Sequence, residues 1–476
     1  MPDITLTVDN VIRVPKPFNE IIRRHFIKEL THDNPQYYME LRAVGGNVKA
    51  VRVPKIIKSY YESDTHFIIP RGTGAFARRV LTHFGYKVNV IDNRVSFSNP
   101  IKFYAQPGWQ LRPHQQIAHE AFKLKEQGVL EAPCGSGKTV HQINEIASKR
   151  QPTMIIVHTK DLMKQWIREI GNRFQLDEGQ IGTIGEGIFE PNIITIGMVQ
   201  TLVRLNKDQW RQLQQMFGMV VCDECHHVPA ETFLFVMNKF PAKYRFGVSA
   251  TPERKDKLHF LLHEFIGPVI HRILDSTLEA AGITMSAQVE KVLTNFDYSY
   301  SGMKSWVFMI NAMAKDEVRN ELIRDTVIKD VQKGNFALVL SDRVDHCKSL
   351  AARLQEVNIK ARYLVGQGLT PEERSHILKE CREGKVDVLL ATQLADEALD
   401  IPNLGSVHLT CPSNNEGKLK QRVGRIRRAV EGKKLPTVYD YVDHLIDKCC
   451  DIWRNRKKWY TNWGFQVDQQ LQLPLY

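Results

Sequence analysis

Short apolar runs alternate with amphipathic stretches over most of the chain. From residue 99 onward, ten of these runs have the length and composition of buried strands: Gly128–Glu131, Thr153–Val157, Ile193–Ile196, Met219–Cys222, Phe246–Val248, Phe336–Leu340, Ala361–Leu364, Val386–Leu390, Ser406–Leu409 and Val438–Tyr441. Strands that alternate with helices favour a doubly wound parallel sheet. The pattern therefore predicts two α/β lobes, joined near Leu274–Thr284.

The first 98 residues follow a different pattern. Short β-like runs are interrupted by a helical stretch at Phe18–Leu30, and the runs are Ile4–Val8, Val48–Val53, Phe67–Ile69, Lys87–Ile91 and Arg94–Phe97. We therefore expect three parts: a small α+β accessory domain (1–98), a first lobe (99–276) and a second lobe (277–476). The polar and aromatic segment Asn295–Lys304 is expected to be a loop or insertion.

Composition places the chain in a broad class. Its 476 residues are 43% hydrophobic and 25% charged, which are ordinary globular values. No apolar run approaches the roughly 18–20 residues that cross a bilayer, and eight cysteines in a chain of this length do not indicate a disulfide framework. We expect a protein of the cytoplasm, or of the host cytoplasm if it is viral, without membrane contact.

The net charge of +12 is unevenly distributed. Residues 1–108 carry 16 Lys and Arg against 9 Asp and Glu, and residues 412–476 carry 13 against 7. A basic surface attracts polyanions, although a solvated face that maintains solubility has the same composition. Charge alone leaves both interpretations open.

A phosphate-binding loop is the strongest single signal. The sequence APCGSGKT, Ala132–Thr139, directly follows the strand GVLE. Glycines allow backbone N–H groups to converge on phosphate oxygens, a lysine reaches the β- and γ-phosphates, and a hydroxyl binds Mg²⁺. The residues predicted to bind ATP in this loop are Gly135, Ser136, Gly137, Lys138 and Thr139. Ala132 stands where the usual pattern has its first glycine.

An acidic pair follows the apolar run MVVCDECHH, at the carboxyl edge where ligands bind such sheets. Asp223 is predicted to contact Mg²⁺ together with Thr139, and Glu224 to be the base for the attacking water. Cys222 and Cys225 form a C-x-x-C, but no second pair has zinc spacing. Cys134, inside the phosphate loop, is a candidate site of inhibition by alkylation.

These motifs together resemble superfamily-2 helicases of the DExH kind, in order over about 350 residues. The resemblance implies two RecA-like lobes. In LRPHQQ it implies that Gln115 reads the adenine base and that Arg112 supports it. In VHTKDLMKQW and TIGMVQTL it implies contacts to the nucleic-acid backbone by Thr159, Lys160, Gln200 and Thr201; His158 stands where the family often has proline. Coupling of hydrolysis to movement is implied for His226, Ser249 and Thr251.

The resemblance extends to the second lobe. It implies nucleic-acid contacts by Arg343 in LSDRVDHC and Thr392 in LLATQLADEALDIP, and a place near ATP for Asp400. Ala398 stands where glycine is common. QRVGRIRR matches the element that reaches the γ-phosphate from the other lobe, with Gln421, Arg425 and Arg428 as its residues.

A positive group held against the transferring phosphoryl group accelerates hydrolysis by about 10³–10⁵. Arg425 and Arg428 are three residues apart, which places them on one face if the segment is helical. By the same spacing we expect Arg422 and Arg427 to lie on a solvated or phosphate-binding face. The predicted cycle is closure of the lobes on ATP, hydrolysis and reopening, with one step along the nucleic acid.

Within the superfamily the chain most resembles the XPB- and UvsW-type group, in particular phage branch-migration helicases. The residues that carry this resemblance are LRPHQQ, GVSATPERKD, FIGPVI and RNRKKWYTNWGF. The group implies a monomeric motor that acts on branched DNA in recombination, repair or replication. The accessory domain (1–98) is expected to bind duplex or forked DNA and to orient the motor, with Arg71, Arg78 and Arg79 of IIPRGTGAFARR as its DNA contacts. Tyr60, Tyr61, Phe67 and Phe76 fit a core better than a surface that stacks on bases or wedges a fork.

Three alternatives remain from the sequence. RNA is not excluded as the substrate, because contacts along a backbone ignore base identity. The chain also fits the translocase subunit of a restriction or defence assembly, with cleavage by a partner. A nucleic-acid-binding scaffold with an inactive ATP site is the alternative outside the enzymes.

Overall fold

The computed structural model describes residues 1–98, 101–176, 179–223, 230–249, 258–366, 368–392 and 401–471. It divides into two compact units, Met1–Leu274 and Asp275–Tyr476. The first unit contains the N-terminal sheet and an eight-stranded sheet, and the second contains a seven-stranded sheet. We call the eight-stranded sheet with its helices lobe 1 and the second unit lobe 2. Within the described part of the chain, no helix is both long and apolar enough to cross a membrane.

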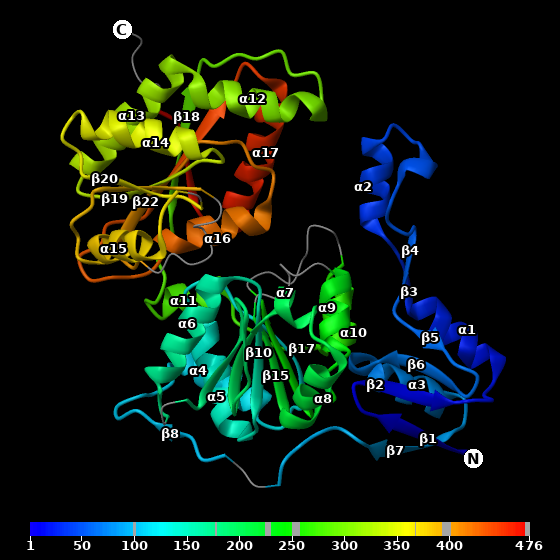
Figure 1. Ribbon diagram of the computed structural model, residues 1–476. Helices are drawn as coiled ribbons and strands as arrows, with labels where there is room; N and C mark the ends of the chain where they lie inside the picture. The colour runs from blue at the N-terminus through cyan, green and yellow to red at the C-terminus, as the bar shows by residue number, and fades with distance from the viewer. Residues whose placement is uncertain are drawn as a thin grey trace. The chain divides into compact units, whose positions relative to one another are not determined.

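The N-terminal part is an α+β sheet whose strand order is β5-β6-β2-β1-β7 (Figure 1). Its core is formed by the apolar faces of α1, α3 and the central strands. The elements are β1 (Asp3–Val8), β2 (Val11–Pro15), α1 (Glu20–Glu29), β3 (Thr31–Asp33), α2 (Pro35–Ala43), η1 (Val48–Ala50), β4 (Ile56–Lys58), β5 (Tyr61–Glu62), β6 (His66–Pro70), η2 (Arg71–Thr73), α3 (Gly74–His83) and β7 (Lys87–Asp92).

Two strand predictions for this part are wrong. Val48–Val53 begins with the short helix η1, because the alternating side chains have no partner strand to bury them. Arg94–Phe97 forms only an isolated bridge, between Val95 and Ala242. The sequence did not predict the other elements of this part, namely β2, β3, α2, β4, β5, η2 and α3.

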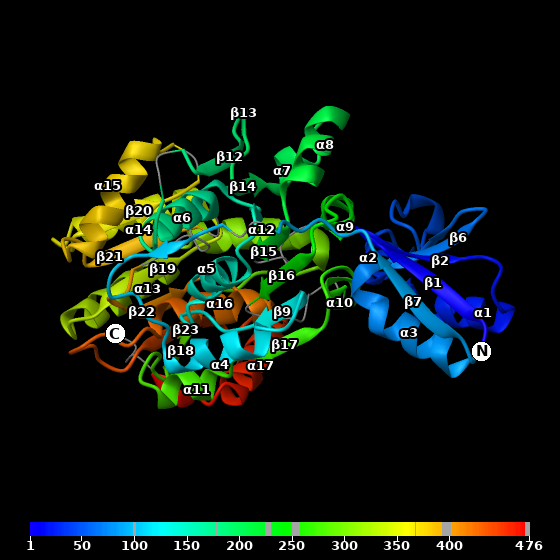
Figure 2. The same cartoon turned by 90° about the horizontal axis from the view of Figure 1, so that it is seen from below.

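Lobe 1 has the strand order β13-β12-β14-β10-β15-β16-β9-β17, parallel except for β12 with β13. Helices α4, α5 and α6 cover one face and α8, α9 and α10 the other (Figures 1 and 2). The elements are β8 (Tyr104–Ala105), α4 (Pro113–Phe122), β9 (Gln127–Glu131), α5 (Lys138–Lys149), β10 (Thr153–Val157), α6 (Lys160–Gly171), β11 (Phe174–Gln175), β12 (Ile181–Gly185), β13 (Ile188–Glu190), β14 (Ile194–Met198), α7 (Val199–Leu202), α8 (Lys207–Met216), β15 (Met219–Asp223), α9 (Ala230–Met237), β16 (Tyr244–Ser249), α10 (His259–Phe265) and β17 (Val269–Arg272).

Lobe 2 is a parallel sheet in the order β20-β21-β19-β22-β23-β18-β24. Helices α13 and α14 pack on one face, and α15, α16 and α17 on the other. The elements are α11 (Asp275–Ala280), β18 (Gln288–Thr294), α12 (Met303–Lys315), α13 (Glu317–Gln332), β19 (Phe336–Leu340), α14 (Val344–Gln355), β20 (Ala361–Leu364), α15 (Pro371–Arg382), β21 (Val388–Ala391), β22 (Leu404–Leu409), α16 (Glu416–Ile426), β23 (Thr437–Asp443), α17 (Asp447–Asn462) and β24 (Gln466–Leu471).

All ten strands predicted for the two lobes are present, with ends shifted by a few residues. Their near-continuous apolar composition fits strands that are covered on both faces by helices. The fold class predicted from the sequence, two doubly wound parallel sheets and a small α+β part, is confirmed. The division at 98 and 276 stays a prediction.

Candidate functional site

The phosphate loop has a conformation that depends on its glycines. Gly135 and Gly137 have φ angles of 85° and 78°, which L side chains rarely adopt. A Cβ at Gly137 would also lie 2.2 Å from Nε2 of Gln115. Gly137 is the N-cap of α5, whose first two residues, Lys138 and Thr139, are half-buried. The loop therefore places the start of a twelve-residue helix, with its free N–H groups, at the edge of the sheet.

Two side chains from α4 hold the loop from behind. The Nε2 atoms of His114 and Gln115 lie 2.9 Å and 3.1 Å from the carbonyl oxygen of Ser136. Oε1 of Gln115 accepts a hydrogen bond from the backbone N–H of Arg112 at 3.0 Å. The amide of Gln115 is thus engaged at both ends in this structure, and its predicted contact to adenine stays a prediction. His114 was missed from the sequence, although it lies inside the quoted LRPHQQ.

Asp223 and Ser249 lie on strands next to this loop, at the same carboxyl edge. Asp223 is the last residue of β15 and pairs in register with Val248, while Ser249 pairs with Glu131 at the end of β9. The N–H of Ala132 donates to the carbonyl of Ser249 at 3.0 Å. Asp223 and Ser249 are both buried. Parallel register therefore brings three predicted elements together.

Asp223 has a partner that the sequence analysis did not identify. Nε1 of Trp166 donates to Oδ2 of Asp223 at 2.7 Å. Trp166 lies on α6 and is fully buried. Trp166 is the last residue of VHTKDLMKQW. Its indole N–H usually finds a hydrogen-bond partner when it is buried, and this was the feature of the sequence that could have indicated the contact. This bond links the helix that follows β10 to the acidic end of β15.

The predicted nucleic-acid elements of lobe 1 lie on the other side of β15. β10 pairs with both β15 and β14, and Val157 is in register with Met198. Thr159 caps α6, where its hydroxyl accepts from the N–H of Leu162 at 3.3 Å. Gln200 donates to the carbonyl of His158 at 2.9 Å. The two segments are therefore joined directly, and Lys160 beside them is 62% exposed and paired with Glu186. Thr201, on α7, is half-buried.

In lobe 2 the predicted residues also follow neighbouring strands. Leu340 is in register with Ala391, so that Arg343 and Thr392 come after adjacent strand ends. Arg343 donates from Nε to Oδ1 of Asn311 at 2.6 Å, and Thr392 is buried. The roles of both residues stay predictions.

The arginine-rich element differs from the expectation. α16 ends at Ile426, so Arg428 lies beyond the helix, in an isolated bridge with Thr284. The argument that Arg425 and Arg428 share one helical face is wrong. Gln421, Arg425 and Arg428 are each half-buried.

The expectation of a solvated face for Arg422 and Arg427 is also wrong. Arg422 is 5% and Arg427 is 4% exposed. Arg427 pairs with Asp275 at 2.8 Å and with Glu279, and it donates to the carbonyl of Met285 at 2.8 Å. Arg427, the C-cap of α16, therefore joins the end of this helix to α11, and Arg422 lies 3.8 Å from Asp342.

In the N-terminal part, the predicted DNA contact of Arg71 is wrong. Its side chain is 2% exposed and donates to Oε1 of Gln127 at 2.8 Å, to the carbonyl of Lys243 at 2.6 Å and to that of Ala242. These three hydrogen bonds join η2 to lobe 1. Arg78 and Arg79 are exposed on α3 and remain candidates.

The aromatic residues of this region mostly belong to the core, as expected. Phe67 is fully buried, Tyr60 stacks on it with ring centroids 5.0 Å apart, and Phe76 packs against Phe26. Tyr61 is 58% exposed.

Four predicted residues lie outside the described residues: Glu224, His226, Thr251 and Asp400. Cys225 of the C-x-x-C does as well, whereas Cys222 is buried and Cys134 is half-buried.

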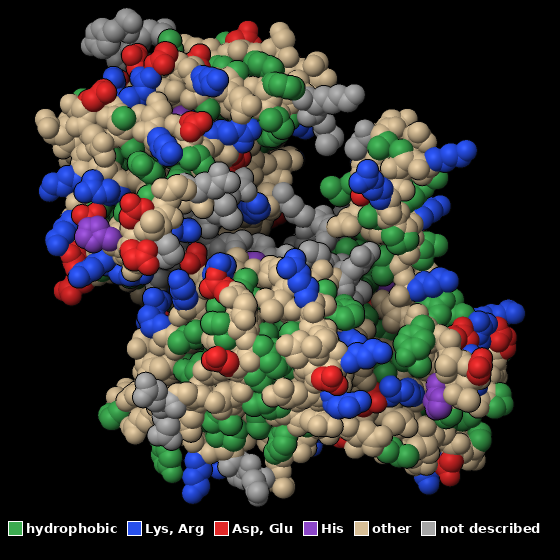
Figure 3. Space-filling model, in the orientation of Figure 1, with side chains coloured by type: hydrophobic (Ala, Val, Ile, Leu, Met, Phe, Trp, Pro, Cys, Tyr) green, Lys and Arg blue, Asp and Glu red, His purple; other side chains and the backbone are tan. Residues whose placement is uncertain are grey.

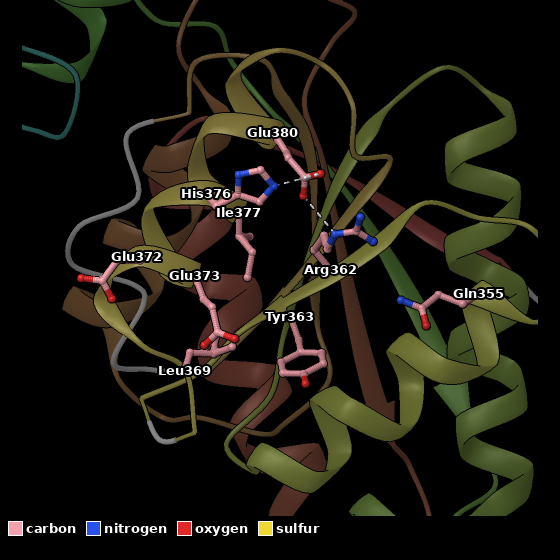
Figure 4. Close-up of a pocket in the computed structure, with 9 residues that line it drawn as sticks. All are labelled: Gln355, Arg362, Tyr363, Leu369, Glu372, Glu373, His376, Ile377 and Glu380. Atoms are coloured by element: carbon pink, nitrogen blue, oxygen red, sulfur yellow. Dashed lines mark hydrogen bonds and ion pairs between the residues drawn. The ribbon is translucent and has the colours of Figure 1, made fainter.

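A cavity of about 480 Å³ lies in lobe 2 between α14, β20 and α15 (Figure 4). Apolar side chains of Tyr363, Leu369 and Ile377 form part of its wall. Glu380 lies 3.0 Å from Arg362 and 3.7 Å from His376. None of the predicted site residues is among the described residues that line it.

Two family models match the chain. "Type III restriction enzyme, res subunit" matches residues 108–254, and "Helicase conserved C-terminal domain" matches residues 317–430. The first covers the phosphate loop and Asp223, and the second covers Arg343, Gln421, Arg425 and Arg428.

Curated relatives extend the similarity over most of the chain. The "DNA 3'-5' helicase XPB" of Mycobacterium tuberculosis is 26% identical over 392 residues, which cover 79% of this chain and 68% of the relative. "Probable helicase D10" of Escherichia phage T5 is 25% identical and covers 75% and 76%. The resemblance to XPB-like and phage helicases is confirmed.

Among solved structures, Saccharomyces cerevisiae Dbp5 bound to RNA and ADP BeF3 superposes with a TM-score of 0.54. The identity is 13%, and the match covers 74% of this chain and 88% of that chain. This similarity supports the fold of the two lobes. The two family models and the curated relatives, without this structure, identify the chain as a superfamily-2 helicase and an ATP-hydrolysing enzyme.

Proposed function

We propose that the protein is an ATP-dependent DNA helicase or translocase that acts on branched DNA, such as forks, junctions and displaced strands. The observation that carries this proposal is the arrangement at one sheet edge of lobe 1. The phosphate loop follows β9, the backbone-contacting segments follow β10 and β14, and Asp223 lies between them on β15. The relatives named as DNA helicases support DNA as the substrate.

The oxygen donors at this edge fit Mg²⁺, which prefers carboxylate, hydroxyl and water ligands. Thr139 and Asp223 would hold the ion, and Trp166 fixes one carboxylate oxygen of Asp223 by its 2.7 Å hydrogen bond. Bound Mg²⁺ neutralises developing phosphate charge. Because Trp166 is fully buried, its hydrogen bond also opposes a shift of the Asp223 carboxylate.

Each remaining residue has one proposed task. Lys138 and the N-terminus of α5 stabilise the phosphates. Glu224 accepts a proton from the attacking water, and Arg425 and Arg428 neutralise the γ-phosphate. Thr159, Thr201 and Thr392 hold the nucleic-acid backbone, and His226, Ser249 and Thr251 couple hydrolysis to movement. Gln115, Arg112 and Asp400 contact the nucleotide.

The Trp166 bond gives this scheme a direct mechanical link. The N-terminus of α6 carries Thr159, and its buried face carries the donor to Asp223. A displacement of α6 by bound nucleic acid therefore moves the donor of a metal-binding carboxylate. Stimulation of hydrolysis by nucleic acid is the expected consequence.

The test is to measure ATP hydrolysis and strand separation together, on single strands, forks, four-way junctions and RNA duplexes at stated salt concentrations. We expect forks and junctions to give the largest effects. If RNA stimulates ATP hydrolysis more strongly than DNA does, the substrate is RNA and not DNA. Absence of hydrolysis with every nucleic acid would leave a binding scaffold and contradict the proposal.

Two lysines of α5 provide a matched pair for this test. Lys138→Ala is expected to abolish turnover and leave DNA binding nearly unchanged, as is Glu224→Gln. Lys149, at the other end of the helix, donates to the carbonyls of Phe122 and Lys123. Lys149→Ala is expected to retain turnover. A monomeric motor in the cytoplasm, or in the host cytoplasm for a viral chain, is part of the same proposal.

A further inference from the structure

An arm extends from the N-terminal part between α1 and β5. It consists of residues Thr31–Lys58, which include β3, α2, η1 and β4. β3 and β4 form its base as a short antiparallel ribbon with three residue pairs, from Thr31↔Lys58 to Asp33↔Ile56. α2 stands away from the N-terminal sheet (Figure 1), and no described side chain of this helix is buried. The arm therefore has no core of its own.

The base of the arm is fixed to lobe 1. His32 lies 2.7 Å from Oε1 of Glu264, and its ring centroid is 3.8 Å from that of Phe260. Ile57, on the facing strand, packs against the lobe 1 core. Both partners of His32 belong to α10, which begins eight residues after Thr251 in the sequence. The arm is thus held at a defined place by a helix of the motor.

The outer surface of the arm combines apolar and basic side chains. Met39 is 62%, Val48 is 61% and Ile56 is 44% exposed. The arm carries five Lys and Arg against two acidic residues. These basic residues are all exposed, namely Arg42, Lys49, Arg52, Lys55 and Lys58. Figure 3 shows blue and green side chains side by side on this projection.

The two acidic residues, both among the described residues, form no ion pair with these basic side chains and leave an excess of positive charge on the arm. Glu40 accepts from the backbone N–H of Arg52 at 2.9 Å, and Asp33 accepts from the hydroxyl of Tyr38 at 3.3 Å. Across the described ranges of the chain, none of the five basic side chains forms an ion pair. The cations of the arm remain available for a partner of opposite charge.

Exposed apolar side chains gain free energy when a partner covers them, because their contact with water is unfavourable. Nucleic acid matches both properties of this surface. Its phosphates bind lysine and arginine, and apolar side chains insert between base steps where a duplex opens. An acidic protein would satisfy only the charges, and a membrane would not account for the anchor on a motor helix.

We propose that the arm is a separate duplex-binding element, which grips the backbone with its basic residues and places Met39 and Val48 against the bases where the strands part. This inference rests on the proposed function. Because His32 joins the arm to α10, the arm is expected to keep its distance from the site in lobe 1 during the cycle.

The first test removes the charge. The triple substitution Lys49→Ala, Lys55→Ala and Lys58→Ala is compared with Lys360→Ala, Lys379→Ala and Lys385→Ala, three exposed lysines of lobe 2. Binding to a forked duplex is measured against salt concentration without nucleotide. Loss of three phosphate contacts lowers the slope of log K against log salt by about 2.7 in the arm variant. The control variant retains the slope of the unmodified protein.

The second test removes the apolar surface. Met39→Ser with Val48→Ser is expected to reduce the rate of fork separation by about tenfold, because the shorter polar side chains bury less apolar surface against the bases. Hydrolysis stimulated by single strands stays unchanged, which also shows that the variant is folded.

Two results separate this inference from the function on which it rests. Salt slopes and separation rates equal to those of the unmodified protein overturn the arm proposal, provided that single strands still stimulate hydrolysis. An unmodified protein that no nucleic acid stimulates contradicts the proposed function itself. Equal loss of binding to single strands and forks in the arm variants also overturns the arm as a duplex element.

Discussion

Both parallel sheets hold buried polar side chains, but with different partners. In lobe 1 three of them lie at or after the carboxyl ends of strands: Ser136 after β9, Asp223 on β15 and Ser249 on β16. In lobe 2 the buried charges lie on or beside β22 and β23 and bond to helices behind the sheet. Arg319 of α13 pairs with Asp443 at 2.7 Å, and Arg456 of α17 pairs with Asp440 at 2.6 Å.

The lobe 2 groups form networks of several hydrogen bonds, in which Nη1 of Arg319 has no partner among the described residues. Asp443 also accepts from Thr294 at 2.5 Å, and Asp440 from the hydroxyl of Tyr460 at 2.8 Å. Arg456 bonds in addition to the carbonyls of Ser413 and Cys411. Asp443 is the last residue of β23, as Asp223 is of β15, so a place at the end of a strand does not separate the two uses of buried polar groups. Their partners do, because Asp443 and Asp440 are each paired with a buried arginine that joins a helix to the sheet. Burial alone does not make this distinction.

Arg425 gives the largest expected effect, because it is one of the two lobe 2 arginines that we assign to chemistry. Arg425→Ala is expected to lower ATP hydrolysis by about 10³–10⁵ with little change in Tm. Lys379→Ala, a change of charge on exposed α15, serves as the control. A lower Tm with normal hydrolysis would place Arg425 with Arg427 among the structural arginines.

The substitution of Arg319 is expected to have the next largest effect, and this effect is on the free energy of unfolding. Arg319→Met leaves Asp443 buried without its cation, which costs about 3–5 kcal/mol of unfolding free energy. Arg353→Met is the matched control, because its partner Glu317 is 70% exposed and such pairs contribute at most about 1 kcal/mol. Denaturant titration measures both. Equal losses would mean that the network of Arg319 and Asp443 does not stabilise lobe 2.

His346 makes lobe 2 sensitive to acid. Burial, with the nearby charges of Arg319 and Arg353, lowers its pKa to about 3. The unfolded chain binds a proton near pH 6.5 and the folded chain does not, so stability is present above pH 6.5 and falls as the pH drops toward 3. Between pH 7 and 5 the loss is about 2 kcal/mol. His346→Asn should show a correspondingly smaller loss in denaturation at the two pH values.

The substitution of Trp166 is expected to have the smallest effect, and this effect is on the Mg²⁺ dependence of hydrolysis at the carboxyl edge of the lobe 1 sheet. Trp166→Phe removes the donor to Asp223, and a bond of about 1.5 kcal/mol corresponds to a roughly tenfold rise in the Mg²⁺ concentration for half-maximal hydrolysis. Trp210→Phe, a change at another buried tryptophan of lobe 1, should leave that concentration unchanged. Similar Mg²⁺ curves for the two variants would remove Trp166 from the site.

The strands and the phosphate loop were predictable because local signals agree with the tertiary environment. Buried strands such as Thr153–Val157 consist of apolar residues throughout, and the glycines at 135 and 137 are required by their own backbone angles. Val48–Val53 has the alternation of a strand, but no partner strand lies beside it. Whether a strand has a partner depends on the whole fold, and the sequence of the segment alone does not indicate it.

The burial and the partners of individual arginines were the least predictable part of the site. Arg71, Arg422 and Arg427 occur in basic stretches that favour anion binding, yet each is buried with acceptors remote in sequence. The partner of Asp223 was hidden for the same reason, since 57 residues separate it from Trp166. Sequence spacing identifies residues within one loop or helix turn; it does not identify partners that the sheet brings together.

The contacts of Arg71 imply that the first 98 residues cannot be removed cleanly. Truncation would leave the carbonyls of Ala242 and Lys243 without their donor and would uncover the lobe 1 surface under Ile57. Gly72 lies so close to the last turn of α10 that a Cβ would be 2.2 Å from the carbonyl oxygen of His263. Weak DNA binding by a shortened chain could therefore result from damage to lobe 1 as well as from the loss of a DNA contact. Point substitutions on the arm leave the contacts of Arg71 and Gly72 with lobe 1 intact.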